Sequence, residues 1–339
     1  MKLLIVAPLN QALPSLDIYA PVEQHCHAVA QELKNRGHEV IVVALQGGIP
    51  IEGVGFMDMA DGDEEKAYNS YKEKLKDFDC ILDFSTLKYP FLFKQETLKD
   101  LHLIGCVYPY QGQGYQNAPP VAFPCFVGTS DAHAKALSLK FGVAARVVNY
   151  GVKANSIERQ PGDRMLFLGR FVKEKGPQVA IDLARQTRIG LDLAGEDINV
   201  PDQRFLIYLL QRCDGRLVKS LGRLNENSKA DMISKAKCLI LPYLSDDVAY
   251  TCIPAIEAIS QGVPVVALKK GAIGEFIKDG VNGFLVERME DLADAVKRVD
   301  ELNEAPLRVM ESAQGFTLQV SVDKYEDLIK GIVDKGLEW

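Results

Sequence analysis

The sequence lacks the short motifs of several common enzyme classes. It contains no G-x-S-x-G element, so a hydrolase with a nucleophile elbow is not indicated. The chain reads PLNQALPSLD after its first apolar run, without the G-x-G-x-x-G element of a dinucleotide-binding dehydrogenase, and a kinase-like P-loop is absent as well. The sequence thus gives no sign of these three enzyme classes.

Basic blocks and long apolar runs are also missing. The 339 residues include 39 Lys and Arg against 46 Asp and Glu, a formal net charge of −7. This balance argues against a nucleic-acid-binding protein, whose affinity comes from neutralising phosphates. No 18 apolar residues follow one another, and the apolar run in MKLLIVAPLN is too short for a signal peptide. We expect a cytoplasmic protein with a local basic site, and contact with a membrane surface stays open.

Cysteine and histidine do not occur at metal-ligand spacings. The seven cysteines form no C-x-x-C pair and several lie in apolar runs, as buried thiols do. The five histidines have no Cys or carboxylate neighbours at ligand spacing. We predict no metal site.

The sequence does contain a regular alternation of apolar strands and amphipathic helices, which predicts parallel α/β sheets covered on both faces. In the first half we expect strands at Leu3–Ala7, Glu39–Ala44, Cys80–Phe84, Leu103–Val107, Ala122–Val127 and Ala145–Asn149, with one helix between the first two and another from Ser130 toward Gly142. In the second half we expect strands at Met165–Leu168, Gly190–Ala194, Leu217–Leu221, Cys238–Leu241, Pro264–Ala267 and Phe284–Val286, and helices near 177–187, 201–213, 226–236, 254–261 and 289–303.

A polar segment containing Pro161-Gly162 separates the two alternations and predicts a linker around Gly151 to Asp163. A chain of this length favours two domains. We predict an N-terminal Rossmann-like domain over residues 1–155, a second over 164–315, and a terminal segment 316–339 with an amphipathic helix.

The stretch Met165 to Ala184, MLFLGRFVKEKGPQVAIDLA, predicts a strand, a loop and a helix. Its loop places Arg170 and Lys175 beside Gly176 and the start of the helix. Two cations and unpaired backbone N–H groups can then converge on one anion, for which phosphate is the natural candidate. The alternative is that both side chains are solvated charges.

The segment Leu239 to Val266 repeats this order, with Glu257 in the second helix. A carboxylate accepts two hydrogen bonds at once and suits the paired hydroxyls of ribose, although Glu257 could instead favour the helix dipole. Ligands of open parallel sheets bind beyond the carboxyl ends of the strands, so we expect the site in a cleft between the two domains.

These segments resemble retaining glycosyltransferases of the family 4 type. The spacing Gly169-Arg170, four residues, Lys175-Gly176 resembles their GR-x4-KG element, and PAIEAISQGVPVVAL with the glycine-rich turn at Gly271 is similar to their donor-binding half. The resemblance implies the GT-B fold, an α/β architecture of two facing Rossmann-like domains with an interdomain cleft. It also implies a last helix that crosses back to the N-terminal domain.

The resemblance further implies a function and its residues. In the family, the Arg and Lys hold the diphosphate of a nucleotide-sugar and the Glu binds the ribose, so Arg170 and Lys175 would be the catalytic pair. The implied reaction is metal-independent and moves a sugar, with retention, from a nucleotide-diphosphate-sugar substrate to a hydroxyl of a sugar, lipid-linked sugar or small molecule, without a further cofactor. The implied donor site consists of Gly169, Arg170, Lys175, Arg223, Asp247, Glu257 and Gly271.

The sequence departs from the family at one important position. The family carries a second acidic residue eight positions before the ribose-binding Glu, and here that residue is Ala249. Asp246 or Asp247 could reach the same hydroxyls. The alternatives are a nucleotide-sugar-binding protein or partner subunit without transferase activity, or another GT-B enzyme such as a nucleotide-sugar epimerase. Asp61-Gly-Asp63 matches the D-x-D pair of metal-dependent glycosyltransferases, but we interpret it as a solvated turn.

Overall fold

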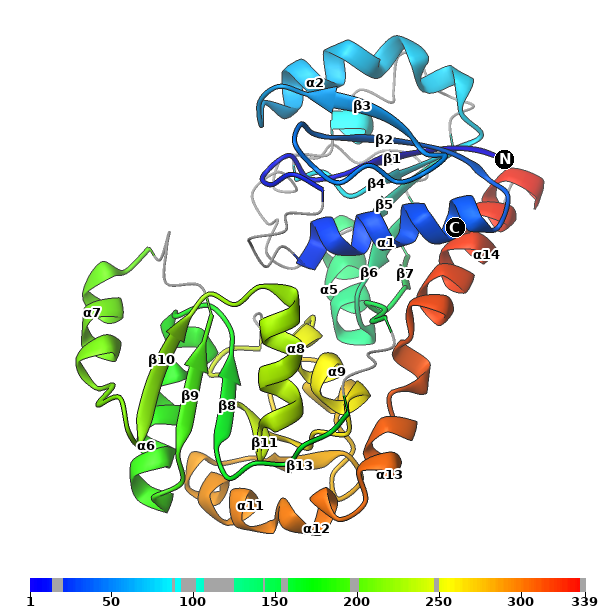
Figure 1. The fold of residues 1–339 in the computed structure, drawn as a ribbon. Coiled ribbons are helices and arrows are strands. Elements are labelled where there is room, and N and C mark those ends of the chain that lie inside the picture. Colours follow the sequence, from blue (N-terminus) through cyan, green and yellow to red (C-terminus); the bar gives the residue numbers. More distant parts are fainter. Residues whose placement is uncertain are drawn as a thin grey trace. The chain divides into compact units, whose positions relative to one another are not determined.

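The computed structural model describes residues 1–13, 21–86, 89–92, 102–106, 125–142, 144–153, 158–195, 201–246 and 250–335. The chain divides into two compact units. Among the described residues, unit 1 contains those up to Gly151 together with the helix that starts at Leu318, and unit 2 contains those from Val152 to Thr317. In each unit, helices pack around one parallel β-sheet (Figure 1).

Unit 1 is built on a seven-stranded sheet with the order β3-β2-β1-β4-β5-β6-β7, and every neighbouring pair is parallel. The central strands are continuous apolar runs because both faces of the sheet are covered. The elements are β1 (Lys2–Val6), α1 (Pro21–Asn35), β2 (Glu39–Leu45), β3 (Gly55–Met59), α2 (Glu64–Tyr71), η1 (Lys72–Asp77), β4 (Cys80–Asp83), α3 (Tyr89–Leu92), β5 (Leu103–Cys106), β6 (Cys125–Gly128), α5 (Asp131–Phe141), β7 (Ala145–Val147) and α14 (Leu318–Lys335).

The edge strand β3 is missing from the strands predicted by the sequence. Its sequence, GFMDM, includes a glycine and an aspartate, and none of its residues is buried. An edge strand is paired on one side only, and its residues can remain exposed to solvent. Its sequence therefore needs no continuous apolar run. Hydrogen bonding to β2 therefore places this segment in the sheet, although its composition gives little sign of it.

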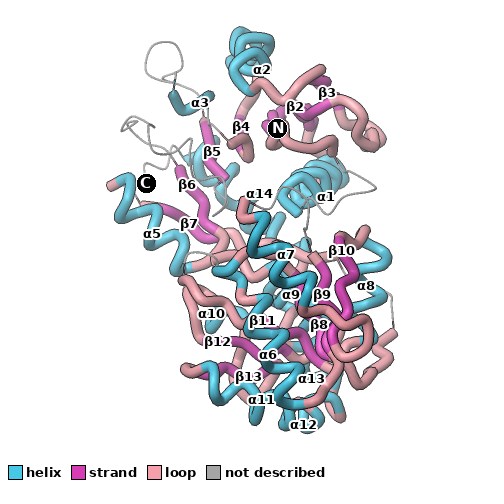
Figure 2. Tube along the Cα trace, turned by 90° about the vertical axis from the view of Figure 1, so that its left-hand side faces the viewer, coloured by secondary structure: helices cyan, strands magenta, loops and turns pink. Residues whose placement is uncertain are grey.

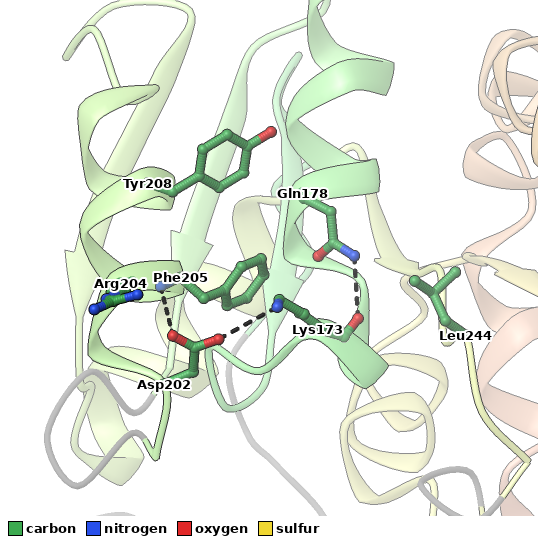
Figure 3. A pocket seen from close by; sticks show the side chains of 7 residues that line it. All are labelled: Lys173, Gln178, Asp202, Arg204, Phe205, Tyr208 and Leu244. Carbon is green, nitrogen blue, oxygen red and sulfur yellow. Dashed lines mark hydrogen bonds and ion pairs between the residues drawn. The ribbon is translucent and has the colours of Figure 1, made fainter.

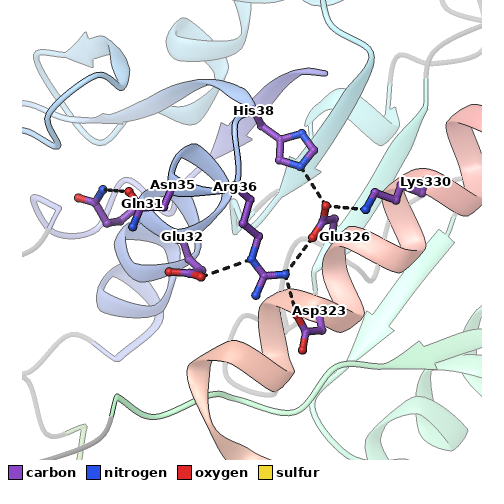
Figure 4. Close-up of polar contacts among 8 residues, drawn as sticks. All are labelled: Gln31, Glu32, Asn35, Arg36, His38, Asp323, Glu326 and Lys330. Atoms are coloured by element: carbon purple, nitrogen blue, oxygen red, sulfur yellow. Dashed lines mark hydrogen bonds and ion pairs between the residues drawn. The ribbon is translucent and has the colours of Figure 1, made fainter.

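The C-terminal helix α14 packs against α1 within unit 1. Its apolar stripe, predicted from the sequence, is buried at Val322, Tyr325, Ile329 and Ile332. Figure 4 shows the polar side of this contact, where the Arg36 guanidinium donates to Asp323 at 2.6 Å and to Glu326 at 2.8 Å. A mixed apolar and ionic contact thus joins the two ends of the chain.

Unit 2 is built on a six-stranded parallel sheet with the order β10-β9-β8-β11-β12-β13. Helix α6 contacts α11, and α8 contacts α9. Figure 2 shows the helices of this unit in cyan around its strands in magenta. The elements are β8 (Met165–Leu168), η3 (Lys173–Lys175), α6 (Pro177–Thr187), β9 (Leu191–Ala194), α7 (Gln203–Gln211), β10 (Val218–Gly222), α8 (Glu226–Lys235), β11 (Cys238–Leu241), α9 (Ile253–Ser260), β12 (Val265–Leu268), α10 (Ile273–Phe276), β13 (Gly283–Val286), η5 (Met289–Asp291), α11 (Leu292–Arg298), α12 (Asp300–Asn303), α13 (Pro306–Glu311) and η6 (Gln314–Phe316).

Two expectations for this unit differ from the structure. The end of the expected linker is bound to unit 2, because the N–H groups of Gln160 and Gly162 donate to the carbonyl oxygens of Ser234 and Lys235. The single helix expected near 289–303 is divided into η5, α11 and α12. Within the described part of the chain, no helix has both the length and the hydropathy needed to cross a membrane.

Candidate functional site

The loop between β8 and α6 has a conformation that requires glycine at its last position. Gly176 has a φ of 75° and is the N-cap residue of α6, which continues with Pro177. A Cβ atom at Gly176 would overlap the carbonyl oxygen of Pro242, on the loop that follows β11. The Leu244 N–H also donates to the Glu174 carbonyl oxygen at 2.8 Å. The loops after β8 and β11 are thus held together at the carboxyl edge of the sheet.

The two cations predicted on this loop differ in their surroundings. Arg170 is exposed, whereas Lys175 is only 6% exposed, and its Nζ lies 4.1 Å from the centre of the Tyr243 ring. Burial lowers the pKa of Lys175 to about 7, an effect partly opposed by Cys252, and the positive charge of Arg170 lowers it further. A buried ammonium with a cationic neighbour is a suitable place for an anion to bind.

Glu257 lies on α9 and forms an ion pair with a lysine from α8. Its Oε1 atom is 2.7 Å from Lys229 Nζ, and this nitrogen also lies 2.8 Å from Glu226 Oε1. The side chains of Lys229 and Glu257 are 7% and 13% exposed. Burial raises the pKa of the Glu257 carboxyl, and the Lys229 charge opposes this effect. The sequence predicts Glu257 on this helix, whereas no sequence motif marks Lys229.

Arg223 and Gly271, the remaining predicted site residues that the structure describes, lie on loops at the same edge of the sheet. Arg223 follows β10 and is half-buried. Gly271 follows β12, and its N–H donates to Asp246 Oδ1 at 2.7 Å. Asp247 and Ala249 lie outside the described residues. The structure thus brings Gly169, Arg170 and Lys175 onto one loop and places the other described candidates on neighbouring loops or on α9.

A hollow of about 680 Å³ opens on the exposed side of the β8–α6 loop (Figure 3). Within it, Lys173 Nζ lies 3.3 Å from Asp202 Oδ2, and the Gln178 side-chain amide donates to the Lys173 carbonyl oxygen. Its lining residues are Lys173, Gln178, Asp202, Arg204, Phe205, Tyr208 and Leu244. The loop therefore carries one exposed lysine with a carboxylate partner and one buried lysine against an aromatic ring.

The acidic turn in unit 1 acts as a helix cap. Asp63 is the N-cap residue of α2 and accepts hydrogen bonds from the N–H groups of Glu65 and Lys66, while its own N–H donates to Asp61. Among the described residues, no group of three or more His, Cys, Asp or Glu side chains is arranged to hold a metal ion.

Comparison with known proteins identifies the segment that carries this site. The family model described as Glycosyl transferases group 1 matches residues 153–316, which is nearly all of unit 2. This segment matches the group 1 glycosyl transferase family. It contains the β8–α6 loop, Glu257 and the other predicted donor-site residues. The resemblance drawn from the GR-x4-KG spacing is thus confirmed at the level of this family.

One curated relative and two solved structures show the extent of the similarity. An uncharacterized glycosyltransferase of Methanocaldococcus jannaschii is 26% identical over 168 residues, which cover 47% of this chain and 44% of the relative. A glycosyltransferase structure from Rickettsia africae has a TM-score of 0.72 at 18% identity and covers 98% of each chain. The Anabaena protein HepE, solved in complex with UDP-glucose, has a TM-score of 0.75 at 16% identity and covers 96% of this chain and 98% of its own.

These likenesses differ in what they establish. The chain spans less than half the length of the curated relatives it matches. The structural matches extend over nearly the whole chain at low identity, and they establish the fold. The protein has the α/β architecture of two parallel-sheet domains found in GT-B glycosyltransferases, as the sequence predicted.

Proposed function

We propose that the protein is a glycosyltransferase that moves a sugar from a nucleotide-diphosphate donor to an acceptor hydroxyl. The observation that carries this proposal is the buried ammonium of Lys175, which lies beside Arg170 on the β8–α6 loop of a group 1 glycosyl transferase domain. In the ligand-free protein, a buried cation near a second positive charge lowers the free energy of unfolding. A diphosphate bound beside these two cations would add negative charge where positive charge is concentrated.

The positive charges of Arg170 and Lys175 also account for how the proposed reaction would be catalysed. Breaking the bond between the anomeric carbon and the diphosphate oxygen develops negative charge on the departing diphosphate. Arg170 and Lys175 would stabilise this charge, and Lys175 would do so from a position shielded from water. We propose that transfer needs no metal ion and proceeds with retention, as the family resemblance implies.

Glu257 is proposed to recognise the ribose of the donor. Its carboxylate lies on α9, the helix that follows β11, and Cys252 is the N-cap residue of this helix. The HepE structure in complex with UDP-glucose supports a nucleotide-sugar as the donor class. The proposed acceptor is a hydroxyl of a sugar, a lipid-linked sugar or a small molecule.

The test is a transfer assay with a panel of nucleotide-sugars and acceptors, read by the release of nucleoside diphosphate and by the mass of the product. The proposal predicts sugar transfer that falls about 30- to 1000-fold in Lys175→Met, because one charge-assisted contact contributes about 2 to 4 kcal/mol to the barrier. Lys173→Met is the matched control and should keep its rate. Turnover unaffected in Lys175→Met would contradict the assigned role.

A second candidate function follows from Ala249, which stands where the family has an acidic residue. The protein would then bind a nucleotide-sugar without transferring the sugar. This candidate predicts donor binding without turnover in the parent, and activity in Ala249→Glu. Product formation from the donor alone, with no acceptor present, would instead indicate an epimerase on the same architecture.

A further inference from the structure

An ion-pair cluster with a buried lysine connects α8 and α9, which lie side by side (Figure 1). Lys229 Nζ bridges two carboxylates, with Glu257 Oε1 at 2.7 Å and Glu226 Oε1 at 2.8 Å. Lys229 is 5% exposed, whereas the side chain of Glu226 is 51% exposed. The lysine thus reaches from the surface of α8 to a buried carboxylate on α9.

The two oxygens of Glu257 have different surroundings. Oε1 accepts from Lys229, while Oε2 is buried and has no hydrogen-bond partner among the residues that the structure describes. A buried carboxylate oxygen without a partner is costly, so such an atom usually marks a place that a ligand or water completes. Because Lys229 fixes Oε1, it also fixes the direction in which Oε2 points.

We propose that Lys229 is a positioning residue for donor recognition: it pairs with Oε1 of Glu257 and thereby directs Oε2 to a hydroxyl of the donor ribose. This inference rests on the proposed function, since it assumes that Glu257 binds the nucleotide. Lys229 has a second effect, because its charge counteracts the burial that favours the protonated form of Glu257. A protonated carboxyl would present a different set of donors and acceptors to the ribose.

The consequence is a measurable preference for ribose over deoxyribose. A hydrogen bond to a charged group contributes enough to favour the ribonucleotide about 10- to 100-fold over an analogue that lacks the contacted hydroxyl. If Lys229 aims the carboxylate, this preference requires both residues. If Lys229 only stabilises the contact between α8 and α9, its loss lowers stability and leaves the preference unchanged.

The experiment measures dissociation constants for UDP, ADP and GDP and for their 2′-deoxy and 3′-deoxy analogues. The parent should prefer the ribonucleotide that it binds about 10- to 100-fold over one deoxy analogue. Lys229→Met should reduce this ratio to about 1 to 3, and Lys229→Arg, which keeps the charge, should restore most of it. Lys235→Met is the matched control, because Lys235 is a half-exposed lysine of α8 paired with Asp231.

A variant cycle keeps the test informative if Lys229→Met is unstable. In a Glu257→Gln background the second substitution, Lys229→Met, should leave the ratio unchanged, because the carboxylate that it positions is already gone. A ratio that stays at the parent value in folded Lys229→Met would overturn the inference while leaving the proposed function intact. Failure of the parent to bind any of the nucleotides would instead count against the proposed function itself.

Discussion

The buried ammonium of Lys175 predicts that donor binding weakens as the pH rises. With a pKa of about 7, the side chain is charged in about half of the molecules at pH 7, about one tenth at pH 8 and about one hundredth at pH 9. The diphosphate of a nucleotide-sugar keeps its charge over this range. If the charged lysine is the binding form, the apparent association constant should fall about 50-fold between pH 7 and pH 9.

The substitution Lys175→Met removes the charge and keeps a flexible apolar chain of similar length. At pH 7 it should weaken donor binding and should abolish the pH dependence. It should also stabilise the ligand-free protein. The folded-state pKa lies below the ordinary value of 10.5, so this lysine destabilises the fold below pH 10.5, with the full effect below pH 7. Its removal should raise the free energy of unfolding at pH 7 by at most about 4 kcal/mol.

Isothermal titration of a nucleotide-sugar between pH 7 and pH 9 measures this dependence, with Lys173→Met as the control. Lys173 belongs to the same loop, but its side chain is 62% exposed and pairs with Asp202. In the Lys173→Met variant, the association constant should therefore fall with pH as steeply as in the parent. All five histidines precede residue 134, so none of them belongs to residues 152–317 of unit 2. An association constant that does not change with pH in the parent would refute the role of Lys175. The same dependence on pH in Lys175→Met would also refute it.

Two further predictions concern stability. Gly176→Ala should lower the free energy of unfolding by more than about 1 kcal/mol, because the position combines a φ of 75° with close contact to a backbone carbonyl oxygen. Gly215→Ala, with a similar φ and open space around it, is the control, and equal losses in thermal melts would contradict the close-contact explanation. Lys330 and Arg36 lower the pKa of Glu326 to about 2, so its contribution to stability is present above pH 4.5 and is lost as the pH falls toward 2. Glu326→Gln should therefore show a smaller loss of stability in acid than the parent, and identical acid melts would contradict this role.

Most of the fold could be predicted from the sequence because buried parallel strands are continuous apolar runs. The strands Met165–Leu168 and Cys238–Leu241 and the helix Pro177–Thr187 have the predicted bounds. The edge strand β3 could not be predicted, since a half-exposed strand of mixed composition acquires its structure from pairing with β2.

The sequence could predict only those parts of the candidate site whose residues lie close together in the chain. The spacing of Arg170 and Lys175 is visible in the chain, and the loop indeed holds both residues next to the start of α6. The pairing of Lys229 with Glu257 joins residues 28 positions apart on two helices, so it depends on how α8 packs against α9. Burial of Lys175 against Tyr243 likewise arises from contact between two loops.

The central claim is that this protein uses a nucleotide-sugar, and the most direct test is thermal unfolding with a panel of nucleoside diphosphates and nucleotide-sugars. A ligand at 100 times its dissociation constant stabilises a protein by about 2.7 kcal/mol, which a melting curve resolves. The account predicts that nucleotides sharing one base stabilise the parent and have a much smaller effect on Lys175→Met. If no nucleotide or nucleotide-sugar stabilises the parent, or if the stabilisation is the same in Lys175→Met, the account is contradicted.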